Sequence, residues 1–206
     1  MWDLTYLLSI LATVVFSVTG VLAARGSHID LFGVMVVGVV TAVGGGTIRD
    51  IILGVPVWWV VQPEYVAIAI AAAVATFAMP ALLQKGYKAL LYLDALGVAL
   101  FATGAVASTL ALELTYLHAT VMGIISGIGG GIIRDLLTGR PTLVMSRDLY
   151  ATPILLGIFL QLLLLSTGLV ESHIALLLGG ALIFCSRSAA IYWHLQMPSF
   201  LTLDRK

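Results

Sequence analysis

Two copies of one motif place three glycines beside an adjacent pair of opposite charges. Residues 44–50 read Gly-Gly-Gly-Thr-Ile-Arg-Asp, and residues 129–135, 85 positions later, read Gly-Gly-Gly-Ile-Ile-Arg-Asp. Each glycine costs about 1 kcal/mol of helix propensity relative to alanine. Glycines also leave backbone amides and carbonyls uncovered, which hydrocarbon does not tolerate but a water-filled cavity does. The motif therefore predicts a helix that breaks or bends beside a polar pathway. Close helix packing through small residues is the alternative.

The charged pair that ends each copy has two open interpretations. Neighbouring residues on a helix point about 100° apart, so we expect Arg49 and Asp50 not to face each other. Ionisable groups within a membrane mark functional sites by default, which favours charges that line or gate a pathway. A structural ion pair is the alternative. The candidate residues are Gly44, Gly45, Gly46, Arg49 and Asp50 in the first copy and Gly129, Gly130, Gly131, Arg134 and Asp135 in the second.

The elements that hold these motifs are long apolar segments. The chain of 206 residues is 61% hydrophobic and 10% charged, whereas soluble domains carry about a quarter charged residues. A membrane-spanning helix needs about 20 mostly apolar residues. This composition predicts an all-α integral membrane protein, whose first span is retained and is not a cleaved signal peptide. The predicted spans are residues 4–24, 31–53, 65–83, 89–112, 116–137, 149–165 and 174–193.

The motif repeat extends to the spans around it. Eight of 16 positions are identical between residues 41–56 and 126–141. Spans one to three (about 4–83) thus correspond to spans four to six (about 89–165), and the seventh (174–193) stands alone in a single domain, 1–206. Units of three spans insert with opposite topology, and inverted repeats with interrupted helices indicate a transport site. We therefore predict two inverted three-helix repeats, with helices 2 and 5 kinked at the glycine triplets.

Charge and polar residues give further expectations. Most Lys and Arg residues fall on one side if the N-terminus lies outside and the C-terminus in the cytoplasm. Ser17, Thr19 and Thr103 are weaker pathway candidates, because such hydroxyls commonly bond to their own helix. We expect Asp94 to be solvated at the interface and Arg187 to extend to the cytoplasmic face.

Several functions are not expected. Net charge is zero and no long basic run occurs, so we expect no nucleic acid partner. The single cysteine and the lack of His-x-x-x-His or Glu-x-x-His spacing predict no metal site. There is also no nucleophile–base motif, so we expect neither an enzyme nor a cofactor.

The doubled Gly-Gly-Gly-x-x-Arg-Asp motif in a seven-span chain of this length resembles the prokaryotic trimeric intracellular cation (TRIC) channels. These are grouped with bacterial membrane proteins described as glycine transporters. The resemblance covers essentially the whole chain. It implies a homotrimer in the plasma or inner membrane, in contact with lipid, with one pore per protomer beside the kinked second and fifth helices. It also implies conduction of monovalent cations, chiefly K⁺, with Na⁺ as a further permeant ion.

Three functions stay open on the sequence. The leading one is a potassium-permeable channel. The second is a secondary transporter of a small amino acid such as glycine, in which helix amides face the carboxylate of the substrate. The third is a membrane scaffold in which the glycines serve packing alone.

Overall fold

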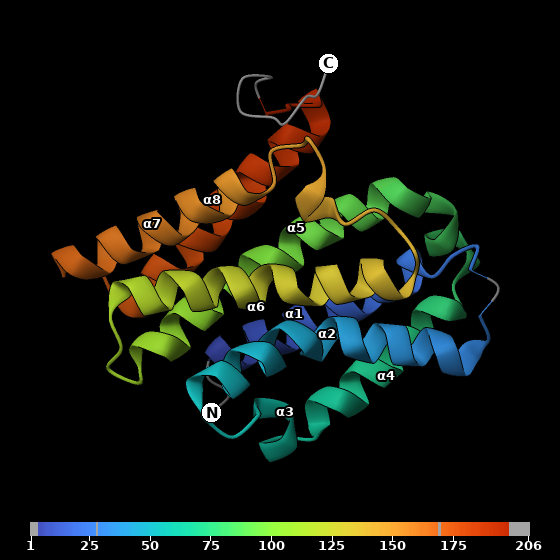
Figure 1. Ribbon diagram of the computed structural model, residues 1–206, viewed down its shortest axis with the longest axis horizontal. Helices are drawn as coiled ribbons and strands as arrows, with labels where there is room; N and C mark the ends of the chain where they lie inside the picture. Colours follow the sequence, from blue (N-terminus) through green and yellow to red (C-terminus); the bar gives the residue numbers. More distant parts are fainter. Residues whose placement is uncertain (1–3, 28, 169, 198–206) are drawn as a thin grey trace.

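The protein is a bundle of helices, and the computed structural model describes residues 4–27, 29–168 and 170–197 (Figure 1). Arg205 and Lys206, which contribute to the predicted orientation, lie outside these residues. The helices are α1 (Leu4–Ala23), α2 (Leu31–Leu53), α3 (Trp58–Val61), α4 (Glu64–Phe77), α5 (Pro80–Leu110), α6 (Tyr116–Leu137), η1 (Leu143–Met145), α7 (Ala151–Thr167) and α8 (Ser172–Trp193).

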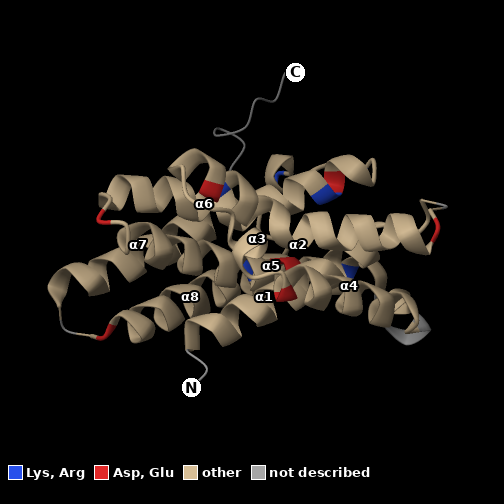
Figure 2. Ribbon diagram, turned by 90° about the horizontal axis from the view of Figure 1, so that it is seen from below, with Lys and Arg blue, Asp and Glu red and all other residues tan. Residues whose placement is uncertain are grey.

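The composition of these helices makes this a multi-pass membrane protein. Five of them, α1, α2, α5 from Gly86 onward, α6 and α8, are long and apolar enough to cross a membrane, and α4 and α7 are shorter apolar helices. Figure 2 shows how few positions on the ribbons carry Lys, Arg, Asp or Glu. Some of these charged residues are nevertheless buried inside the bundle. Charges inside an apolar bundle require partners, and these partners define the candidate site below.

The predicted third and fourth spans have the wrong boundary between them. The sequence suggested spans over 65–83 and 89–112, whereas α4 ends at Phe77 and α5 begins at Pro80. Proline suits the first position of a helix because its missing N–H has no helical partner there. Within α5, Gly86 is non-helical (φ 57°, ψ −136°), a conformation that glycine adopts without a Cβ clash. The other predicted spans agree with the helices to within two residues.

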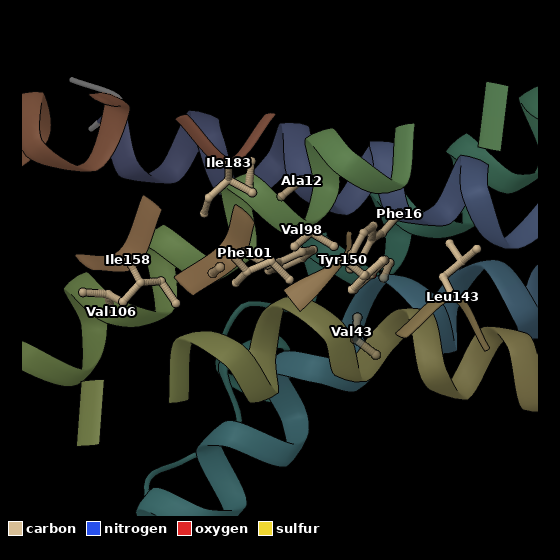
Figure 3. Close-up of a cluster of buried hydrophobic side chains, with 14 of the residues drawn as sticks. Ala12, Phe16, Val43, Val98, Phe101, Val106, Leu143, Tyr150, Ile158 and Ile183 are labelled. Carbon is tan, nitrogen blue, oxygen red and sulfur yellow. The ribbon is translucent and has the colours of Figure 1, made fainter. Parts of the chain in front are cut away.

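The core lies where α1, α2, α5 and α6 meet. α4 packs on α1 and α2, whereas α8 packs on α5 and α7. Phe16 and Phe101, which are 85 positions apart, pack near the centre with ring centroids 5.1 Å apart and ring planes tilted by 37° (Figure 3). Figure 1 shows the α2–α3, α5–α6 and α7–α8 connections at one end of the bundle and the α1–α2 and α4–α5 connections at the other.

The glycine triplets do not interrupt their helices. Residues 44–46 of α2 and 129–131 of α6 are helical, as are the residues on both sides. The expected break is therefore absent, and the predicted kink stays a prediction. Packing explains why the helices tolerate the glycines, because the triplets lie where α2 and α6 touch.

Candidate permeation site

The two triplets form a reciprocal contact between α2 and α6. A Cβ atom added at Gly45 would collide with the backbone oxygen of Ser126, and one at Gly130 would collide with that of Thr41. These positions are equivalent in the repeat, since Thr41 and Ser126 are also 85 residues apart. Small residues allow backbones to approach this closely. The glycine triplets therefore serve close helix packing, which was the alternative role that the sequence left open.

The neighbouring glycines follow the same reciprocal pattern. A Cβ at Gly44 would lie 2.8 Å from Ile133 Cδ1, and one at Gly129 would lie 3.5 Å from Ile48 Cδ1. Ile48 and Ile133 are again equivalent positions. The contact between α2 and α6 therefore has a two-fold pattern, in which equivalent residues of the two helices make equivalent contacts.

Each Arg–Asp pair is an ion pair between neighbouring residues, contrary to the expectation that the two do not face each other. Arg49 Nε donates to Asp50 Oδ1 at 2.8 Å, and Arg134 Nε donates to Asp135 Oδ1 at 2.8 Å. The guanidinium reaches its neighbour because the arginine side chain is long and bends back, which the angle between Cβ atoms does not capture.

The second oxygen of each aspartate holds the next segment of chain. Asp50 Oδ2 accepts the N–H of Trp58 at 2.9 Å, where α3 begins. Asp135 Oδ2 accepts the N–H of Leu143 at 3.1 Å, where η1 begins. Both aspartates are almost fully buried. Each motif thus joins the end of its long helix to a short helix that follows.

The two arginines differ in their other partners. Arg134 is fully buried, and its Nη1 donates to Asp94 Oδ1 at 2.8 Å and to Thr19 Oγ1 at 3.2 Å. Two carboxylates therefore surround Arg134. A buried charge without such partners is strongly destabilising, so this network holds α1, α5 and α6 together.

Asp94 is the centre of the network and is not solvated at the interface as expected. It is fully buried, and its Oδ2 accepts the hydroxyl of Tyr150 at 2.9 Å. Arg187 does not extend to the cytoplasmic face either: its exposed fraction is 2%, and its Nη2 lies 3.8 Å from Asp94 Oδ2. Its guanidinium carbon lies 4.1 Å from the Tyr150 ring centroid, and its Nη1 donates to the Leu149 carbonyl at 3.0 Å.

Arg49 lies instead against a cavity of about 190 Å³, which we call the Arg49 cavity. Among the described residues its guanidinium pairs with Asp50 alone, through Nε and Nη2. The cavity is lined by residues of α1, α2, α3, α4, α5 and the α3–α4 connection: Thr5, Ser9, Ala12, Gly46, Arg49, Trp58, Gln62, Tyr65, Leu100, Phe101, Gly104, Ala105 and Ser108.

The second motif borders a different cavity. Asp135 contributes to a space of about 160 Å³ with Tyr87, Leu90, Arg140, Pro141 and Leu143. Arg134 is fully buried and does not line this cavity. Because α2 and α6 end at opposite ends of the bundle, the two cavities lie toward opposite ends (Figure 1).

The weaker pathway candidates are all buried side chains with protein partners. Ser17 donates to the carbonyl of Ala69 on α4 at 2.6 Å, so it links two helices. Thr19 donates to the Phe16 carbonyl, besides accepting from Arg134. Thr103 donates to the Ala99 carbonyl, within its own helix. None of the three lines the Arg49 cavity.

Sequence reasoning missed Asp94, Tyr150 and Arg187 as members of a charged cluster. One signal was available: Tyr65 and Tyr150 are 85 residues apart, as are Ser9 and Asp94. Extending the repeat comparison beyond the motif would have marked Asp94 as a carboxylate that only the second copy has.

Comparisons with known proteins agree with this arrangement. A family model described as glycine transporter matches residues 6–81 and again residues 91–166, two ranges displaced by 85 positions like the motifs. The UPF0126 inner membrane protein YadS of Escherichia coli K12 is 39% identical over 199 residues, 96% of each chain. The UPF0126 membrane protein YvgT of Bacillus subtilis is 38% identical over 159 residues, covering 76% of this chain and 77% of YvgT.

Solved structures of channels have the same fold. The TRIC trimeric intracellular cation channel orthologue from Rhodobacter sphaeroides superposes with a TM-score of 0.88 and 40% identity, covering 93% of this chain and 98% of that one. A TRIC cation channel studied for its conductance superposes with a TM-score of 0.85 and 27% identity, covering 99% of this chain and all of that one.

Proposed function

Because this chain belongs to the glycine transporter family and has the fold of the TRIC channels, we propose that it is a cation channel. The observation that carries the proposal is the likeness to the Rhodobacter sphaeroides TRIC orthologue along 93% of the chain. The permeant ions we propose are K⁺ and, less well, Na⁺. The membrane is the inner or plasma membrane, as the name of the Escherichia coli relative suggests for that protein.

The proposed route runs between two inverted three-helix units of a seven-span chain, with bends at the glycine triplets and the N-terminus outside. It includes the Arg49 cavity at one end and the Asp135 cavity at the other. Phe101 lines the Arg49 cavity, and Phe16 packs on Phe101. Conduction then requires this ring pair to separate. Asp50 and Asp135 offset the neighbouring arginines, so cations are not repelled by an unpaired positive charge.

Recording from the purified chain in planar bilayers tests the channel. We expect unitary currents in KCl, smaller ones in NaCl, and a reversal potential under a salt gradient that excludes chloride as the carrier. Silence across voltages and calcium concentrations would contradict the proposal.

We also propose a homotrimer, by likeness to the trimeric orthologue. The mass of the detergent-solubilised protein should equal three chains plus detergent, and a single-chain mass would refute this.

A glycine transporter is the second candidate, favoured by the family model and by the hydrogen-bond donors of the Arg49 cavity. It predicts saturable uptake of labelled glycine into proteoliposomes without resolved single-channel steps. That result would replace the channel proposal. Unitary potassium currents without saturable glycine uptake would exclude the transporter.

A further inference from the structure

We propose that the Arg49 cavity binds a small carboxylate, whose carboxyl group lies in the first copy where the Asp94 side chain lies in the second. The proposal concerns binding and does not rest on the conduction of ions. It follows from comparing the surroundings of the two arginines, residue by residue, at the constant spacing of 85 positions.

In the second copy, Nη1 of Arg134 has two side-chain partners, Asp94 and Thr19. The equivalent positions in the first copy are Ser9, which is shorter and uncharged, and Gly104, which has no side chain. Both of these residues line the Arg49 cavity. Space around Gly104 is open, because an added Cβ would meet nothing within 4 Å. The cavity is therefore lined by the two residues that replace Asp94 and Thr19 in the first copy.

The tyrosine that contacts the carboxylate is present in both copies. Tyr150 donates its hydroxyl to Asp94 Oδ2. Tyr65 is the equivalent residue and lines the Arg49 cavity together with Ser9. Ser9 in turn donates to the Thr5 carbonyl at 2.9 Å. The first copy thus keeps the arginine and the tyrosine but lacks the carboxylate between them.

The donors around the cavity suit a carboxylate. Nη1 of Arg49 has no partner among the described residues, and arginine binds carboxylates through charge-assisted hydrogen bonds. Trp58 Nε1 is buried without a hydrogen-bond partner in the part of the chain that the structure describes, and an indole nitrogen can only donate. The described lining residues include no carboxylate that would favour a cation instead. A bound carboxylate would be a second acidic partner of Arg49 besides Asp50, as Asp94 is a second acidic partner of Arg134 besides Asp135.

Binding to the full-length protein in carboxylate-free buffer tests the proposal. We would titrate sodium acetate and glycine into the detergent-solubilised protein and follow binding by calorimetry. Sodium chloride would be titrated in the same way, as the control for an anion without a carboxyl group. We expect saturable binding of acetate, absent with chloride, and a rise in the thermal unfolding temperature at saturation. Binding of glycine as well would extend the site to amino acids. Acetate that binds no better than chloride overturns the proposal.

Three variants locate the site. Ser9→Asp supplies the missing carboxylate from the protein, so acetate affinity should fall by at least about tenfold, the value of one charge-assisted hydrogen bond. Arg49→Gln should cause a similar loss. Arg25→Gln, the matched control, removes an exposed arginine that does not line the cavity, and it should bind acetate within about threefold of the parent. Undiminished binding in Ser9→Asp or Arg49→Gln would refute the assignment, whether or not the protein conducts ions.

Discussion

A methyl group added at Gly45 tests whether the triplets exist for helix contact. The added Cβ would collide with the backbone oxygen of Ser126, and a backbone atom yields less readily than a side chain. Overpacking typically costs about 1–3 kcal/mol, and this contact belongs at the upper end. Replacing glycine by alanine within a helix regains about 1 kcal/mol. We therefore expect Gly45→Ala to lower the free energy of unfolding by about 2 kcal/mol.

Two other glycines provide matched comparisons. At Gly44 the one contact of the added Cβ shorter than van der Waals distance would be with Ile133 Cδ1, the end of a flexible side chain, so the substitution should be close to neutral. At Gly104 it would meet nothing within 4 Å, so alanine should stabilise the helix by about 1 kcal/mol. At roughly 2–4 °C per kcal/mol for a chain of this size, the unfolding temperature should fall by about 4–8 °C for Gly45→Ala. It should rise by a few degrees for Gly104→Ala.

Thermal unfolding of the three purified variants in one detergent measures this order. The ranking Gly104→Ala above Gly44→Ala above Gly45→Ala is the expected result. An unchanged unfolding temperature in Gly45→Ala, with the particle size of the parent protein retained, would show that α2 and α6 do not touch as described. The triplet would then have to act through backbone exposure or bending alone.

The remaining predictions concern the buried charges. Asp94→Asn should destabilise the protein by about 3–5 kcal/mol, because Arg134 loses a buried charged partner. Chemical denaturation measures this loss, and Glu171→Gln, a matched change at an exposed position, should leave the free energy of unfolding unchanged. Arg134→Ala should prevent stable folding, which a size-exclusion profile detects. Arg49→Ala should fold but change the single-channel conductance. The reverse outcome would contradict the placement of Arg134 in the buried network and of Arg49 beside a cavity. Tyr150→Phe should cost about 1–3 kcal/mol, since the buried carboxylate loses a donor, and an unchanged unfolding midpoint would count against that hydrogen bond.

The ends of a helix could be predicted from the sequence only where the neighbouring residue types mark them. The apolar runs of α2 and α6 have the predicted limits, because polar or turn-forming residues bound them on both sides. The boundary between α4 and α5 was missed because residues 78–83 are apolar throughout. Hydropathy does not register a turn between apolar residues, whereas the position of Pro80 does.

The candidate site was predictable only in part, for a physical reason. The motif marked Arg134 and Asp135, and both lie in the buried network. The repeat could mark Asp94 only as a carboxylate that the first copy lacks, and nothing in the sequence assigned Arg187 to the network. A charge near a span end looks the same in sequence whether it faces water or another helix. Only the packing of α5, α6 and α8 brings these groups within hydrogen-bonding or ion-pairing distance.

The duplication has kept the packing of the two copies alike while their charges have diverged. Glycine contacts are reciprocal because a close helix crossing leaves no room for a side chain on either partner. The positions around the arginines carry no such restriction. Asp94 and Thr19 therefore fill the surroundings of Arg134, whereas Ser9 and Gly104 leave a cavity beside Arg49. It follows that the second motif serves as the rigid anchor of the bundle, and that Arg49 is the motif arginine that a ligand or ion can contact, because Arg134 is fully buried.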